Sequence, residues 1–151
     1  MSRLKIALIG LGRMGRVHAQ ALAKSKTIEV VAVADTSEQS LSFAKSLFGD
    51  ITTFTDFNDA MRNSGAQSCL IASPTPLHPQ MVQVALENNL HVLCEKPLAL
   101  DVDVAIKLAE SAEAKKLVLQ LGHWRRFSPP WATAKKLLDA GAIGRPIMIR
   151  L

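Results

Sequence analysis

The chain has 151 residues and a net charge of +5, and its composition is 48% hydrophobic and 21% charged. This composition is typical of a globular domain and excludes a disordered tail, because enough apolar surface is present to offset the entropy of ordering the chain. No apolar run approaches the roughly 20 residues that cross a bilayer, so a membrane-spanning helix is also excluded.

Apolar segments typical of buried strands alternate with segments of helical periodicity along the chain. The strand-like segments are 4–9, 28–34, 51–54, 68–72, 91–94 and 117–121, and the helix-like segments are 13–24, 37–48, 56–63, 77–88, 101–114 and 130–140. Strands that are apolar throughout and alternate with helices predict a parallel sheet covered on both faces. Right-handed crossovers then favour an α/β fold with a doubly wound, Rossmann-type sheet.

A further strand is predicted over Pro146 to Leu151, beyond this complete set of six, and no later segment could pair with it. We therefore expect residues 1–122 to form one domain. Residues 123–151 are expected to be a connecting loop, a helix and only the first strand of a C-terminal α/β domain that the chain lacks. Because an unpaired edge strand invites association, self-association through this strand is a further expectation.

The glycine-rich segment after the first predicted strand matches the GxGxxG pattern of dinucleotide-binding domains; it reads Gly10, Leu11, Gly12, Arg13, Met14, Gly15. Gly10 permits the tight turn, Gly12 lets the backbone approach a pyrophosphate, and Gly15 allows close packing of helix against strand. The segment opens a predicted helix, whose N-terminal N–H groups suit phosphates. A glycine-rich turn without a ligand is the alternative.

Asp35 closes the second predicted strand, 20 residues after Gly15. A carboxylate at this point accepts hydrogen bonds from the hydroxyls of the adenosine ribose and repels a 2′-phosphate. No arginine follows at Thr36 or Ser37, so NAD is favoured over NADP as the cofactor. Asp35 could instead cap the next helix, although Ser37 is able to fill that role.

Two more segments follow the fourth and fifth predicted strands, at the carboxyl edge where open α/β sheets bind ligands. The first offers the hydroxyls of Ser73 and Thr75 beside the expected nicotinamide end. The second is Glu95-Lys96-Pro97, and a lysine there could hydrogen-bond a reacting hydroxyl. Proline-stiffened loops with a surface salt bridge are the alternative.

The remaining polar and sulfur-containing residues carry weaker signals. Residues 123–127 (HWRRF) suit an anionic or polyhydroxyl ligand, a contact to a following domain, or a solvated charge pair. His18 and His91 are interpreted as packing residues. Cys69 and Cys94 lie in apolar runs without metal-ligand spacing, so we expect buried thiols in a reducing, cytoplasmic compartment and no metal site.

The positive charge lies at the two ends of the chain. Residues 1–26 and 115–151 are basic, whereas residues 27–114 carry four basic and twelve acidic side chains. A basic protein can bind nucleic acid, but aromatic residues are scarce and no nucleic-acid motif is present. We therefore expect neither a nucleic-acid partner nor a membrane partner.

Together these motifs resemble the family of glucose–fructose oxidoreductase, inositol dehydrogenase and MocA (Gfo/Idh/MocA), over essentially the whole chain. The segments that carry the resemblance are IGLGRMGRVHAQAL, VAVAD, SPTPLHPQMVQVAL, HVLCEKPLA and LGHWRRFSPP. Through GRVHA and RRF, the chain is most similar to the inositol-dehydrogenase-like branch.

The resemblance implies an NAD(P)-dependent dehydrogenase that transfers hydride between the cofactor and a sugar, a cyclitol or a related polyol. It implies that Lys96 is catalytic and hydrogen-bonds the reacting oxygen, while Glu95 and Pro97 shape the loop beside the nicotinamide. It also assigns residues to the nicotinamide ribose and to the mouth of the substrate pocket: Ser73, Thr75 and His78 to the first, and Trp124 and Arg126 to the second.

Members of the family carry a second domain that supplies further catalytic residues. The chain is therefore expected to be the cofactor-binding half of such an enzyme and to be inactive when isolated. A non-catalytic NAD-binding sensor or partner subunit is the alternative. Lys96 favours the enzyme, because a sensor has no need of it.

Overall fold

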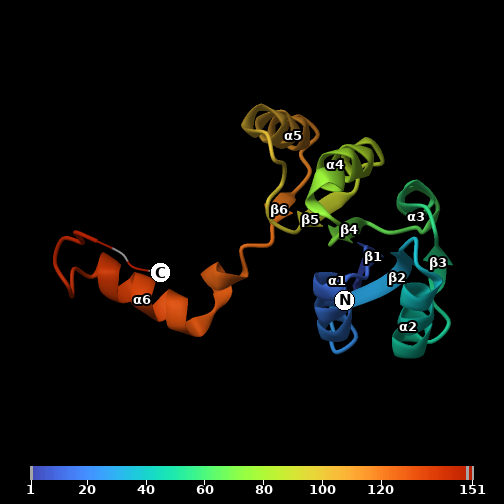
Figure 1. Ribbon diagram of the computed structural model, residues 1–151, viewed down its shortest axis with the longest axis horizontal. Helices are drawn as coiled ribbons and strands as arrows, with labels where there is room; N and C mark the ends of the chain where they lie inside the picture. Colours follow the sequence, from blue (N-terminus) through green and yellow to red (C-terminus); the bar gives the residue numbers. More distant parts are fainter. Residues whose placement is uncertain (1, 149, 151) are drawn as a thin grey trace.

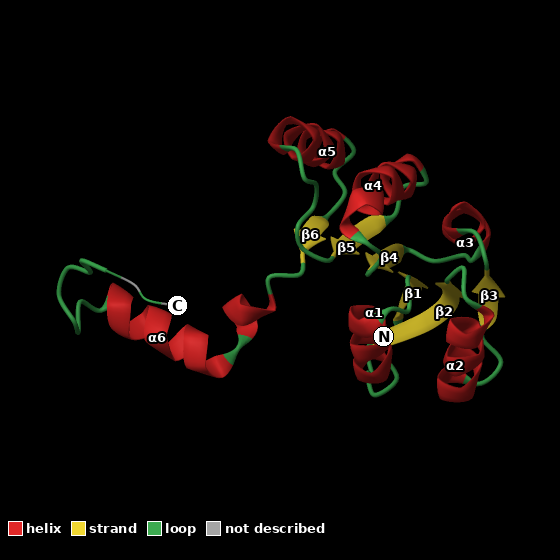
Figure 2. Ribbon diagram, in the orientation of Figure 1, coloured by secondary structure: helices red, strands yellow, loops and turns green. Residues whose placement is uncertain are grey.

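A six-stranded parallel sheet forms the centre of the computed structural model, which describes residues 2–148 and 150 (Figures 1 and 2). The strands are β1 (Leu4–Ile9), β2 (Ile28–Ala34), β3 (Thr52–Phe54), β4 (Ser68–Ile71), β5 (His91–Cys94) and β6 (Leu119–Leu121). Their order is β3-β2-β1-β4-β5-β6, and each neighbouring pair is parallel. This is the strand order of the doubly wound dinucleotide-binding fold, so the predicted fold class is confirmed.

The helices begin and end at local sequence signals. They are α1 (Arg13–Leu22), α2 (Glu38–Phe48), α3 (Phe57–Asn63), α4 (His78–Glu87), α5 (Val102–Ala114) and α6 (Pro129–Asp139), with 3₁₀ turns at Thr75–Leu77 and Trp124–Phe127. Ser37, Asp56 and Asp101 cap α2, α3 and α5 through their side-chain oxygens. The pKa of Asp56 lies below its ordinary value, because the backbone N–H of Asn58 donates to its carboxylate.

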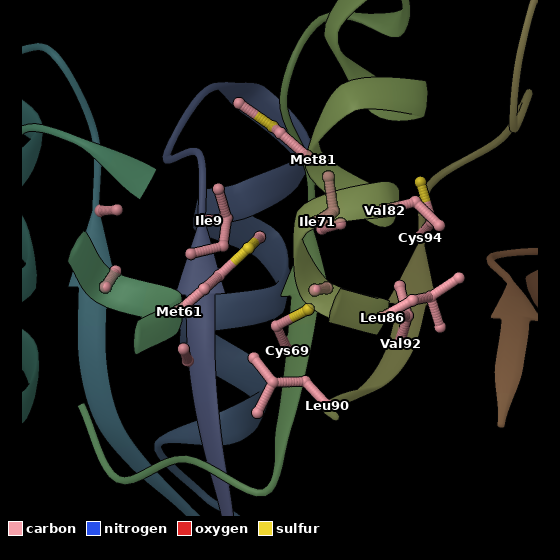
Figure 3. Close-up of a cluster of buried hydrophobic side chains, with 14 of the residues drawn as sticks. Ile9, Met61, Cys69, Ile71, Met81, Val82, Leu86, Leu90, Val92 and Cys94 are labelled. Carbon is pink, nitrogen blue, oxygen red and sulfur yellow. The ribbon is translucent and has the colours of Figure 1, made fainter. Parts of the chain in front are cut away.

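Helices cover both faces of the sheet, as a parallel sheet requires. In Figure 1, α1 and α2 lie on one side, and α3, α4 and α5 lie on the other. The β1 side chains alternate between the two cores: Ile6 and Leu8 pack in one, and Ala7 and Ile9 in the other. Figure 3 shows the core under α3 and α4, where Met61, Cys69, Ile71, Met81, Val82 and Leu86 are buried together.

The glycine loop packs directly against the neighbouring strand end. Gly10 has φ +89°, and a Cβ there would lie 2.9 Å from the backbone of Ala72 and Ser73. A Cβ on Gly15 would overlap the carbonyl oxygen of Gly10. Strands β1 and β4 are where the strand order reverses, so these glycines set the shape of the sheet edge at the point where ligands bind in this fold.

The predicted sixth strand is shorter than expected. It begins at Leu119 rather than at Leu117. The N–H of Leu117 donates to the carbonyl of Ala112, and Lys116 has φ +57°. Leu117 therefore closes the end of α5 and is not available to the sheet.

The predicted C-terminal strand is not found. Pro146, Ile147 and Met148 form no strand, while Ile149 and Leu151 lie outside the described residues. The described sheet ends at β6, and Ile147 is 98% exposed, so the segment has no neighbour with which to exchange backbone hydrogen bonds. The expected self-association through this segment stays a prediction.

Helix α6 lies apart from the sheet and from the helices that cover it (Figure 1). None of its residues is buried, and Trp131 and Leu137 are exposed. Among residues 2–148 and 150, no helix is long and apolar enough to cross a membrane.

We predict that Gly15→Ala destabilises the protein strongly, because the new methyl group must push α1 away from the Gly10 carbonyl. Overpacking of this kind costs about 2–3 kcal/mol, which urea denaturation would measure. Gly12→Ala is the matched control: a Cβ at Gly12 would meet nothing within 4 Å, so its cost should stay below about 1 kcal/mol. Equal losses for the two variants would contradict this account of the loop.

We also predict that both thiols are inert in the folded protein. Burial, reinforced by the nearby charge of Glu95, raises the pKa of Cys94 to about 12, and burial likewise raises the pKa of Cys69. An unfolded thiol ionises near about pH 8.5, so stability should fall as the pH rises above that value towards 12. At pH 8, a disulfide reagent should react only as fast as the chain unfolds; rapid labelling without denaturant would contradict the burial.

Candidate functional site

A cleft of about 820 Å³ opens at the carboxyl ends of β1, β4, β5 and β6. Four segments that are far apart in the sequence line it: the glycine loop, the loop after β4, the loop after β5 and the turn after β6. The sequence-predicted site residues that it brings together are Gly12, Arg13, Met14, Ser73, Thr75, His78, Glu95, Lys96, Trp124 and Arg126.

A second cleft of about 290 Å³ lies on the other side of the glycine loop. Gly10 and Asp35 line it, and it shares Gly12 and Ser73 with the larger cleft. The two clefts together follow the carboxyl edge of the sheet from β3 to β6. The glycine loop forms the boundary between them.

Three predicted site residues line neither cleft. Leu11 is buried in the core under α1, and Gly15 is buried against Gly10. Pro97 contributes its carbonyl oxygen to a hydrogen bond with His78. These residues support the walls of the site.

The N-terminus of α1 opens onto both clefts at Gly12. This residue has extended backbone angles (φ −64°, ψ −165°), and no side chain caps the helix. No acidic residue lies in the first turn, and the space beside Gly12 is clear to 4 Å. An uncapped helix N-terminus with open space in front of it fits a phosphate group.

Asp35 is tied to the glycine loop. Its Oδ2 accepts a hydrogen bond from the N–H of Leu11 at 2.6 Å, and its Oδ1 accepts one from the N–H of Ser37 at 2.9 Å. The carboxylate thus fixes the loop while lining the second cleft, and each oxygen keeps a lone pair for a ligand hydroxyl. Helix α2 is capped by Ser37, so Asp35 is not its N-cap.

His78 is fully buried, and its ring joins two loops of the large cleft. Its Nδ1 lies 2.8 Å from the carbonyl oxygen of Pro97, and its Nε2 lies 2.8 Å from that of Ser73. Both partners are carbonyl oxygens, so the ring donates a hydrogen bond to at least one of them, and its tautomer decides which. This geometry favours a role for His78 in holding the Ser73 and Lys96 loops together.

Glu95 links the lysine loop to α1. Its Oε1 lies 2.8 Å from His18 Nε2, and its Oε2 accepts a hydrogen bond from the N–H of Lys96 at 3.3 Å. His18 was expected to be a packing residue and is instead a partner of a residue that lines the cleft. The two residues are 77 positions apart, so no local pattern in the sequence could have indicated the contact.

Positive charge predominates around the large cleft. Four cationic side chains line it, Arg13, Lys96, Arg125 and Arg126, and one carboxylate, Glu95, faces them. The Arg125 guanidinium lies over the rings of Trp124 and Trp131, at 5.7 and 5.4 Å from their centroids. The cleft therefore suits an anionic ligand.

Sequence reasoning missed several lining residues. They are Thr36, Thr55, Phe57, Leu77 and Met81, all in the second cleft. In the large cleft, His123 and Arg125 belong to the segment 123–127 that the sequence had already indicated as a ligand segment. Thr55 and Phe57 follow the carboxyl end of β3, so the rule that singled out Ser73 and Lys96 would also have found them. Met81 is part of the α4 core face, and no polar signal marks it.

Residues 4–123 match the model of an oxidoreductase family described as having an NAD-binding Rossmann fold, Gfo/Idh/MocA. The chain belongs to this family. It is 35% identical over 150 residues to the rhizopine catabolism protein MocA of Rhizobium meliloti, a match that covers 99% of the chain and 46% of that protein. It is 34% identical over 150 residues to an inositol 2-dehydrogenase of Rubrobacter xylanophilus, covering 98% and 43% respectively.

Solved structures agree with this assignment. The scyllo-inositol dehydrogenase of Lactobacillus casei, crystallised with NAD(H) and scyllo-inositol, superposes with a TM-score of 0.90 at 33% identity. The superposition covers 95% of this chain and 43% of that one. The chain therefore spans less than half the length of these relatives, and the part that it spans holds the family's NAD-binding Rossmann domain.

We predict that His78→Phe, which keeps a planar ring at this position, destabilises the protein by about 1–3 kcal/mol, because the ring no longer hydrogen-bonds the carbonyl oxygens of Ser73 and Pro97. Thermal or urea denaturation would measure the loss. His123→Phe is the control, because His123 lines the same cleft but is exposed. A His78→Phe variant as stable as the control would show that the ring does not hold the loops together.

Proposed function

We propose that this chain binds NAD(H) across the two clefts and is the cofactor-binding half of a dehydrogenase acting on an inositol or a related polyol. The observation that carries the proposal is the pairing of an open, uncapped α1 N-terminus at Gly12 with the Asp35 carboxylate, which follows β2 and is hydrogen-bonded to the glycine loop. The first fits a pyrophosphate and the second fits ribose hydroxyls.

The residues along the sheet edge support an orientation in which the adenosine half of the cofactor lies in the small cleft and the nicotinamide half in the large cleft. The small cleft, lined by Asp35, Thr36 and the apolar Phe57 and Leu77, suits an adenosine. The hydroxyl residues Ser73 and Thr75 and the ammonium of Lys96 line the large cleft on the far side of Gly12, where the nicotinamide half would lie. Asp35 disfavours a 2′-phosphate by charge repulsion, so NAD is the preferred form.

For the chemistry we assign Lys96 the catalytic role. When bound, the nicotinamide ring accepts hydride from a substrate carbon. The Lys96 side chain is exposed in the large cleft and would hydrogen-bond the reacting oxygen. Trp124 and Arg126, on the turn after β6, would contact the polyol. The inositol dehydrogenases among the relatives support this substrate class.

The domain division and the compartment remain proposals as well. The described sheet ends at Leu121, and α6 buries none of its residues. Both observations support a Rossmann domain over residues 1–122, followed by a segment, 123–151, that is the start of a second domain. Both cysteines are free and buried, which supports a reducing, cytoplasmic location.

The first test is a fluorescence titration of the purified chain with NADH and with NADPH. We expect saturable NADH binding at least tenfold tighter than NADPH binding, since a tenfold ratio needs only about 1.4 kcal/mol of charge repulsion at Asp35. Asp35→Ser should weaken NADH and reduce this ratio. Equal affinity of the native chain for the two cofactors would contradict the Asp35 assignment.

Gly12→Ala separates binding from folding in the same assay. Its methyl group would occupy the space in front of the α1 N-terminus, so NADH binding should be lost while the urea midpoint changes little. A folded native chain that binds neither cofactor, or a Gly12→Ala variant that binds NADH normally, would overturn the proposed site.

A further inference from the structure

Glu95 makes two contacts that the proposed reaction does not use. Its carboxylate pairs with His18 on α1 through one oxygen and accepts the backbone N–H of Lys96 through the other. The side chains of His18 and Glu95 are only 25% and 12% exposed. The hydrogen bond between them is therefore largely sheltered from competing water.

Gly122 closes the other side of this carboxylate. A Cβ at Gly122 would lie 3.1 Å from Cδ and Oε1 of Glu95 and 3.2 Å from its Oε2. A side chain at Gly122 would therefore press on the carboxylate, which would have to shift by a few tenths of an ångström. His18 and Gly122 hold Glu95 between α1 and the β6 turn.

This contact joins the proposed pyrophosphate site to the proposed nicotinamide end of the cofactor site. Helix α1 begins at Arg13, directly after Gly12, where the pyrophosphate would bind, and it carries His18 less than two turns later. The Lys96 loop follows β5, and β4 lies between β1 and β5 in the sheet. Strands β1 and β5 are not hydrogen-bonded to each other, so strand pairing fixes the distance between α1 and the lysine loop only through β4. The His18–Glu95 contact joins α1 to the lysine loop directly.

We propose that His18 is a positioning residue, which acts through the Glu95 carboxylate to hold the Lys96 backbone at the nicotinamide end of the cleft. The inference rests on the proposed function and adds to it a residue that touches neither cofactor nor substrate. It distinguishes the two halves of the cofactor: the adenosine half is held by Gly12 and Asp35, and the nicotinamide half depends on His18.

The test compares NADH with ADP-ribose, which has the pyrophosphate and both riboses but lacks the nicotinamide. His18→Ala should weaken NADH about tenfold, the loss expected for one hydrogen bond to a charged group, and should leave ADP-ribose within about twofold. Gln20→Ala, an exposed change on the same helix, should alter neither affinity. Equal losses for both ligands, or no loss for NADH, would overturn the proposal.

Two further variants separate positioning from simple packing. His18→Gln keeps an N–H donor within reach of Glu95 and should recover most of the NADH affinity, whereas failure to recover any would show that only the ring matters and would overturn the proposal. Gly122→Ala displaces the same carboxylate from the opposite side, so it should also weaken NADH selectively. It provides the test if His18→Ala does not fold.

A measurement without ligand keeps this inference distinct from the proposed function. In an amide ¹H–¹⁵N spectrum, the Lys96 resonance should shift in His18→Ala, remain near its native position in His18→Gln and be unchanged in Gln20→Ala. If the native chain binds neither ligand, the proposed function fails while this spectrum still decides the positioning role. A Lys96 amide that is unaffected by His18→Ala would overturn it.

Discussion

The contact between the glycine loop and the end of β4 is the constraint on which the rest of the site depends. Gly10 lies so close to the backbone of Ala72 and Ser73 that a side chain there would collide with it, and a side chain on Gly15 would overlap the carbonyl oxygen of Gly10. This double contact brings the N-terminus of α1 to the edge of the sheet, where its unpaired N–H groups can reach a ligand. Asp35 then fixes the loop from the β2 side.

The site is assembled mainly by backbone groups and by side chains that hold the backbone. Asp35 holds the N–H groups of Leu11 and Ser37, and His78 holds the carbonyl oxygens of Ser73 and Pro97. Each titratable group thus joins two segments that come from different strands. Such cross-links keep the cleft walls in place without a ligand, which lowers the entropy that binding has to offset.

The sequence predicts the elements of the sheet well, because apolar runs and glycines report local requirements. Sequence-based prediction fails where a strand or a side-chain contact depends on residues that are far away in the chain. The strand expected from Pro146 has suitable residues, but the described chain offers it no neighbouring strand. His18 was expected to be a packing residue, and the resemblance assigned His78 to the nicotinamide ribose. Their contacts to Glu95 and Pro97 could not be predicted, because only the fold brings that loop close. Asp35 was predicted as a ligand for ribose, whereas its hydrogen bond to the glycine loop is visible only in the structure.

The strand order also has a consequence for how the molecule is made. β1 is the first strand in the chain and lies at the centre of the sheet, where Ile6 pairs with Ser68 of β4. During synthesis, β1, β2 and β3 therefore leave the ribosome first, and the inner edge of β1 stays unpaired until β4 emerges. Pairing β1 with β4 closes the long chain segment between them, which slows folding. Before β4 pairs with β1, both clefts lack the residues after β4 that line them. A ligand that binds across both halves would stabilise only the completed sheet, so the dinucleotide would draw the two halves of the nascent domain together.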